Sequence, residues 1–274
     1  MISKEKVLKL ISIYCYINGM YGKSLKHTCQ RLSNNADPKF TDAEVMIIYL
    51  YAVGEEYLHK IKHIRSFAKN WLLSCFPLLP SYQEFNARLN FLASAWLALA
   101  AKLLTANIPD GCDFENSIVN SFPIVTCKGR NRTGKVACEI ADKGFCSIKN
   151  MYYYELKLHL LGFRRKATLP FPEMLALSAA SENGLKVFQT EFDPYICNKT
   201  VFADKIYNNS EFFAEKENSQ NYRILTPVKH VKDEPEIIRQ REKAANDLFS
   251  CAISSVRQPV ESLFNWLNVK TGLQ

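Results

Sequence analysis

The chain has 274 residues, of which 47% are hydrophobic and 23% are charged. This balance excludes a disordered or collagen-like chain, and the length predicts two domains. The net charge of +8 favours a polyanionic partner. Positive charge is concentrated in residues 1–105, with 13 Lys and Arg against seven Asp and Glu, and in residues 128–166, with ten against three. Two such blocks are typical of a surface that follows a phosphate backbone, with two solvated faces as the alternative.

Neither a membrane span nor a disulfide framework is expected. The longest nearly apolar stretch, Phe91–Ala101, is about half of the roughly 20 residues that a spanning helix needs. The nine cysteines are an odd number and include no CxxC pair. This pattern fits a reducing cytoplasm.

Residues 1–105 have a helical pattern that predicts about five helices, and their excess of basic residues makes them the candidate DNA-binding region. Thr41 with Glu44 predicts a capping box before a buried helix, and Ser81 with Glu84 repeats the pattern. A basic stretch either lies on DNA or forms a solvated helix face; it comprises Lys60, Lys62, His63, Arg65 and Lys69. His59 and His63 have the spacing of helical zinc ligands, but Lys60 stands where a metalloprotease needs Glu.

Residues 106–274 form the second predicted domain, in which strands precede alternating strands and helices. Period-two patterns and turn residues predict strands at 118–125, 152–160, 175–179, 200–203 and 223–228. Helices are predicted at 184–192, 210–216, 234–250 and 258–270. This order predicts an α/β fold, with a mixed sheet flanked by helices and three antiparallel strands first.

Two acidic residues stand where metal-dependent phosphoryl transfer would need them. Asp204 follows the apolar strand 200–203, and Glu261 lies in a helix that begins near Pro259. Carboxylates from a strand end and a facing helix suit hard divalent cations, whereas a turn or cap is the ordinary role of such residues. The sequence contains no GxGxxG, P-loop or GxSxG motif, and its cysteines lack zinc-ribbon spacing.

Several motifs together closely resemble a bacterial insertion-sequence transposase. They are IVNSFPIVTCKGR at 118–130, DKGFC with MYYYELKLH within 142–159, FADKIY at 202–207, RQPVESLFNW at 257–266 and SYQEFNARLN at 81–90. The resemblance implies an RNase H-like domain after an all-helical N-terminal region. It also implies an Asp-Asp-Glu triad that binds two Mg²⁺, with Mn²⁺ as a substitute, and that cuts and joins DNA.

Carried over by position, the catalytic and metal-binding residues are Asn120, Asp204 and Glu261. Asn120 replaces the expected aspartate, and a neutral amide cannot bridge two cations as a carboxylate does. We therefore expect weakened Mg²⁺ binding and impaired catalysis. Asp113 and Glu115 precede Asn120 by odd separations, which puts them on the opposite strand face unless a bulge intervenes.

Two further departures predict a decaying or truncated copy. Glu155 follows Tyr154 where the family has glycine, and the chain ends soon after the Glu261 helix. An introduced mutation would explain Asn120 equally well, but not the short end.

Basic residues near the implied site predict DNA contacts. A glycine-containing loop with Lys128, Arg130, Arg132 and Lys135 suits phosphates. Lys157 and His159 share the polar face of a strand, for which a half-exposed edge is the alternative. Arg257 lies one helical turn before Glu261 and either pairs with it or binds phosphate.

The leading functional hypothesis is a DNA transposase, impaired by Asn120, that acts on element ends and target DNA as a homodimer in the bacterial cytoplasm, near the nucleoid. The alternative is a catalytically inactive DNA-binding remnant that recognises element ends. A general RNase H-like nuclease is a third hypothesis. Whether the chain is an active enzyme stays open at this point.

Overall fold

The computed structural model describes residues 3–29, 38–128, 137–146, 151–228 and 236–272. The described residues divide into two compact units. The first holds the chain up to Ala106 together with Val269–Gly272, and the second holds Asn107–Asn268. Each unit has its own hydrophobic core.

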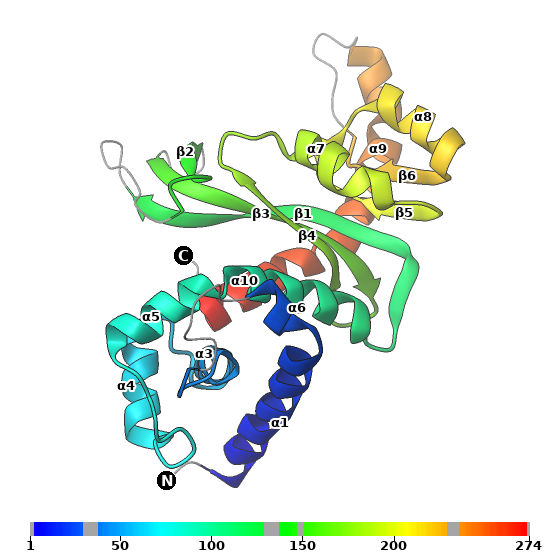
Figure 1. Cartoon of the computed structure of the whole chain (residues 1–274). Helices are drawn as coiled ribbons and strands as arrows, with labels where there is room; N and C mark the ends of the chain where they lie inside the picture. The colour runs from blue at the N-terminus through cyan, green and yellow to red at the C-terminus, as the bar shows by residue number, and fades with distance from the viewer. Residues whose placement is uncertain (1–2, 30–37, 129–136, 147–150, 229–235, 273–274) are drawn as a thin grey trace. The chain divides into compact units, whose positions relative to one another are not determined.

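The described part of the first unit is built from helices (Figure 1). These are α1 (Lys4–Met20), a π-helical turn (Tyr21–Leu25), α2 (Lys26–Thr28), α3 (Asp42–Glu56), α4 (Ile61–Trp71), α5 (Tyr82–Phe91) and α6 (Ala93–Ala106). Among the described helices of this unit, α3 contributes the most residues to the core, and its Val45–Ile48 are fully buried. The capping box is confirmed: Glu44 N donates to Thr41 Oγ1 at 3.2 Å, and Thr41 N donates to Glu44 Oε2 at 2.6 Å.

A buried ion pair joins α3 to α5. Arg88 Nη2 lies 3.1 Å from Asp42 Oδ1, and both side chains are less than a tenth exposed, at 7% and 6%. Tyr21 Oη donates to the other carboxylate oxygen at 3.1 Å, and the Arg88 guanidinium lies over the Phe40 ring. Arg88 Nε and Nη1 are buried without hydrogen-bond partners among the described residues. The pair therefore retains part of its desolvation cost.

The second unit contains a mixed six-stranded sheet, which confirms the α/β class. Its strands are β1 (Cys112–Lys128), β2 (Asp142–Cys146), β3 (Met151–Arg165), β4 (Phe171–Ala179), β5 (Lys199–Phe202) and β6 (Tyr222–Leu225). The order is β2-β3-β1-β5-β6, and β4 also pairs with β3 (Figure 1). The pairs of β3 with β1, β2 and β4 are antiparallel, whereas β1–β5 and β5–β6 are parallel.

Helices and helical turns of the second unit cover both faces of this sheet. The segments are α7 (Gly184–Val187), turns at Phe188–Phe192, Asp193–Tyr195 and Lys205–Tyr207, α8 (Ser210–Gln220), α9 (Glu236–Arg257) and α10 (Pro259–Thr271). One face packs Val119 and Leu161 against aromatic residues of these turns and α8. The other face packs Ile118 and Leu160 against Val260, Leu263 and Phe264 of α10. Two adjacent residues on each strand thus enter different cores.

Among the described residues, no single helix is both long and apolar enough to cross a bilayer. Helices α5 and α6, which are bent by 55° relative to each other, reach the required length and composition only when they are counted as one pair.

Candidate functional site

The carboxyl ends of the parallel β1–β5 pairing bring Asn120 and Asp204 next to each other. The last paired residues are Ile118 and Phe202. Asn120 and Asp204 each lie two residues beyond this pair; alternation along β1 puts Asn120 on the face of Ile118, and Asp204 has extended backbone that continues from β5. Paired strands are about 4.8 Å apart, so the two chains leave the pairing at Ile118 and Phe202 close to each other. Asn120 is part of the long β1, whereas Asp204 follows the end of β5.

Both side chains are held by local hydrogen bonds. Asp204 caps the helical turn after β5, with Oδ1 accepting from Lys205 N at 2.7 Å. Asn120 Oδ1 accepts from Ser121 N at 2.9 Å. The only oxygen of the Asn120 side chain is therefore engaged with the backbone of the next residue, and the amide carries no charge that would attract a cation.

Helix α10 brings Glu261 to the same face of the sheet. Phe264 stacks on Phe122 with ring centroids 5.1 Å apart, and Val260 is fully buried beside Ile118. Glu261 lies in the first turn of this helix and is 60% exposed. A hollow of about 310 Å³ is lined by Asn120, Ser121, Phe122, Glu261, Phe264, Asn265 and Asn268. Asn120 and Glu261 thus border one hollow.

Arg257 pairs with Glu261, and the buried Tyr207 follows Asp204 in the helical turn after β5. Arg257 Nη2 lies 3.3 Å from Glu261 Oε1, and the arginine is only 16% exposed. Burial raises the pKa of the Tyr207 phenol; the negative charge of Asp204 raises it further, and the positive charge of Arg257 opposes this. The Tyr207 hydroxyl is buried and has no hydrogen-bond partner among the described residues. Sequence reasoning missed Tyr207, although it stands in the FADKIY motif.

These donors do not fit a two-Mg²⁺ centre. Such a centre needs carboxylates that bridge two ions about 3.5–4 Å apart. Here one of the three positions is a neutral amide, and Glu261 already pairs with an arginine. No group of three or more His, Cys, Asp or Glu side chains in the described ranges is arranged to hold a metal ion.

Neither Asp113 nor Glu115 replaces the missing acid. The β1–β3 register shifts between Asp113 and Ser117. Such a bulge could bring Asp113 or Glu115 to the face of the sheet on which Asn120 lies. Asp113 Oδ1 nevertheless accepts from the backbone N–H groups of Glu115 and Asn116, both at 3.1 Å. Both acids precede the β1–β5 pairing, which begins at Asn116, whereas Asn120 follows it.

The structure separates Lys157 and His159 from Asn120. They face Pro123 and Ser121 on β1, whereas Asn120 faces Leu160, so they lie on the other side of the sheet. Lys157 Nζ donates to the Glu182 carbonyl at 3.2 Å.

His159 corrects our sequence interpretation. It is 1% exposed, and its Nε2 lies 2.8 Å from Ser178 Oγ. Burial, and then the charge of Lys157, lower its pKa to about 4. The alternative of a half-exposed edge does not hold for His159 either, because β3 pairs with β1 on one side and with β2 and β4 on the other. An enclosed neutral ring is not available to DNA in this structure.

The predicted basic loop lies outside the described residues. Arg130, Arg132 and Lys135 fall in 129–136, and only the backbone of Lys128 is described, at the end of β1. Their contact with DNA therefore stays a prediction.

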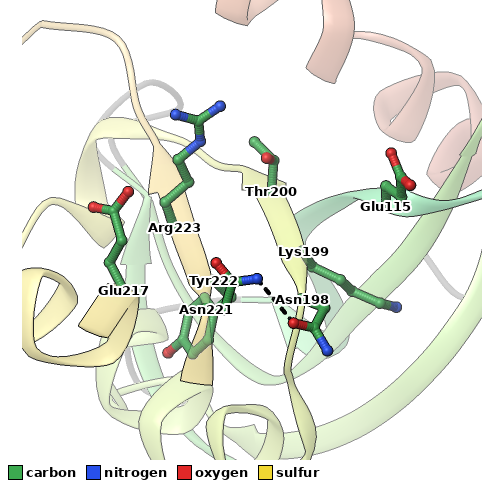
Figure 2. Close-up of a pocket in the computed structure, with 8 residues that line it drawn as sticks. All are labelled: Glu115, Asn198, Lys199, Thr200, Glu217, Asn221, Tyr222 and Arg223. Atoms are coloured by element: carbon green, nitrogen blue, oxygen red, sulfur yellow. Dashed lines mark hydrogen bonds between the residues drawn. The ribbon is translucent and has the colours of Figure 1, made fainter. Parts of the chain in front are cut away.

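A second, polar hollow lies at the amino ends of β5 and β6, opposite to Asp204 (Figure 2). It has a volume of about 430 Å³ and is lined by Glu115, Asn198, Lys199, Thr200, Glu217, Asn221, Tyr222 and Arg223. Asn221 Nδ2 donates to Asn198 Oδ1 at 2.9 Å, and both asparagines have positive φ. Sequence analysis missed this hollow, although an asparagine directly before each of two strands is a signal for left-handed backbone.

Comparison with known proteins adds no assignment: no family model matches the chain, and no curated protein matches it.

Proposed function

We propose that this protein is a DNA transposase by descent, with an RNase H-like second unit whose phosphoryl-transfer site is impaired by Asn120. The observation that carries the proposal is the convergence of Asn120 and Asp204, from the ends of neighbouring parallel strands, with Glu261 from α10 bordering the Asn120 hollow. Strand ends with a facing helix are the arrangement that converging carboxylates require.

The topology of the second unit supports this proposal. Three long strands that pair antiparallel come first, and the parallel strands β5 and β6 follow with helices between and after them. The resemblance to insertion-sequence transposases implies this order. It also implies element-end and target DNA as partners, a homodimer on DNA, and Mg²⁺ or Mn²⁺ as the cofactor of an intact site.

A specific observation favours the alternative, a DNA-binding remnant without cleavage activity. Asn120 contributes no charge, and Arg257 pairs with Glu261. The local charge is then that of two carboxylates and one guanidinium, which is too little to offset two divalent cations. We therefore expect the natural chain to cleave DNA poorly and to retain whatever DNA binding its basic surfaces provide.

The test is nicking of a supercoiled plasmid with Mn²⁺ by the full chain and three variants. We expect Asn120→Asp to cleave at least tenfold faster than the natural chain, because it restores the third acid. Asn120→Asp with Glu261→Gln should lose this gain. Asn265→Asp is the matched control, since it adds one carboxylate to the same hollow without placing it beside Asp204.

Equal cleavage by Asn120→Asp and Asn265→Asp would argue against the proposed triad. Robust Mn²⁺-dependent cleavage by the natural chain that survives Glu261→Gln would contradict the proposal as a whole.

A further inference from the structure

The outer face of α4 is a basic surface that the proposed cleavage site does not use. Helical spacing puts Lys62, Ser66 and Lys69 in one row, with His63 and Asn70 beside them. All five side chains are exposed. The opposite face holds Ile64 and Ala68, which are buried in the core of the first unit.

No salt bridge to an acid offsets the charge of Lys62 or Lys69 within the part of the chain that the structure describes. The sequence contains no Asp or Glu between Glu56 and Glu84. Glu55 and Glu56, at the end of α3, already pair with Lys9 and Lys6, at 2.9 and 2.8 Å. Within the described ranges, neither Lys62 nor Lys69 has an acidic partner within 4 Å, in contrast to these paired lysines.

Arg65 has a structural role that keeps α4 in place. Its Nε and Nη2 both donate to the Pro80 carbonyl, at 3.0 and 2.9 Å. This fork fastens α4 to the segment just before α5. Apolar core contacts and the Arg65 hydrogen bonds thus fix the helix that carries the outer face, so binding orders only the side chains and not the backbone.

We infer that the outer face of α4, formed by Lys62, His63, Ser66, Lys69 and Asn70, binds the phosphate backbone of duplex DNA without reading sequence. Lysine, serine and asparagine are all side chains that bind phosphate oxygens. Lys62 and Lys69 are about 10 Å apart along the helix axis. Each strand of duplex DNA carries a phosphate about every 3.4 Å of the axis, so two flexible lysines about 10 Å apart match the spacing of phosphates a few nucleotides apart.

Other polyanions fit this surface less well. A helix that binds a membrane inserts its apolar face into the headgroups, whereas the apolar face of α4 is buried in the core. The choice of DNA over RNA rests on the proposed function. Binding by α4 does not require a metal, so it is measured in EDTA, and failure of the cleavage site leaves this measurement unaffected.

The experiment is fluorescence anisotropy with the full chain and two labelled 20-base-pair duplexes of unrelated sequence, over a series of salt concentrations in EDTA. The variant is Lys62→Gln with Lys69→Gln. The matched control is Lys23→Gln with Lys26→Gln, which removes two exposed charges elsewhere in the first unit. Unchanged thermal unfolding of both variants establishes that they fold.

We expect the α4 variant to bind both duplexes at least tenfold more weakly at about 0.1 M salt, and its slope of log K against log salt to flatten by about 2. The control should change affinity by less than about twofold. Equal losses in the two variants, a loss confined to one duplex, or no loss would each overturn the inference. Tighter binding of an RNA duplex, or binding of phosphatidylserine vesicles that depends on Lys62 and Lys69, would also overturn it.

Discussion

At the scale of single residues, Asn120 decides what the candidate site can do. For Asp204, the hydrogen bond found among the described residues uses Oδ1, which accepts from Lys205 N. Glu261 is exposed and within reach of a cation, although Arg257 competes for it. The three residues Asn120, Asp204 and Glu261 therefore differ from an Asp-Asp-Glu set by one atom, the amide nitrogen that Asn120 has in place of a carboxylate oxygen.

His159 gives a prediction on pH dependence. Its pKa is lowered to about 4 in the folded chain, whereas an unfolded histidine titrates near pH 6.5. Above about pH 6.5 both states are neutral, and the folded state keeps its full stability. As the pH falls from about 6.5 to 4, only the unfolded state gains the proton, so the free energy of unfolding decreases by on the order of 3 kcal/mol.

Urea unfolding at several pH values measures this effect. His159→Gln keeps a hydrogen-bonding group near Ser178 without the titration, so we expect its stability to change less between pH 6.5 and 4. His63→Gln, at an exposed position on α4, should follow the natural chain. A pH dependence of His159→Gln identical to that of the natural chain would contradict the assignment to His159.

At the scale of elements, the Arg88–Asp42 pair between α3 and α5 gives a prediction on stability. Arg88→Met removes the cation that faces the buried Asp42 carboxylate, and we expect it to lower the free energy of unfolding by about 3–5 kcal/mol. Adding Asp42→Asn removes that charge while Asn can still accept from Tyr21. The double variant should therefore recover part of the loss, as measured by urea unfolding. A double variant less stable than Arg88→Met would show that the ion pair is not the source of the effect.

The elements also show what sequence patterns predict well. The strand at 152–160 alternates in polarity, and β3 contains it; the capping box at Thr41 forms as expected. Strand β2 was not predicted, because it begins with Asp142, contains Gly144 and depends on pairing with β3. The polar residues on one face of β3 predict contact with solvent. His159 is nevertheless buried, and its strand pairs with β4 at this position.

The candidate site likewise depends on strand pairing that sequence patterns do not give. Asp204 and Glu261 were chosen from their places in the predicted elements and from family resemblance, but the sequence does not give the β1–β5 register that sets Asn120 beside Asp204. Tyr207 and the polar hollow in Figure 2 depend on residues that are distant in sequence and meet only in the folded chain.

At the scale of the whole molecule, the basic α4 face and the candidate site lie in different units. The α4 face belongs to the first unit, and the residues around Asn120 belong to the second. A net charge of +8 is moderate, so where the unpaired lysines lie matters more than their number. Binding and cleavage are therefore separable by mutation: substitutions on α4 should alter affinity for DNA, and substitutions at Asn120 should alter cation binding.

The most direct test of the central claim is Mn²⁺ binding, measured by electron paramagnetic resonance on the full chain without DNA. If Asn120 alone disables the site, Asn120→Asp should bind Mn²⁺ at least tenfold more tightly than the natural chain, and Asp204→Asn in the Asn120→Asp background should abolish the gain. Equal affinities of the natural chain and Asn120→Asp would contradict the account, because Asn120, Asp204 and Glu261 would then not form one cation site.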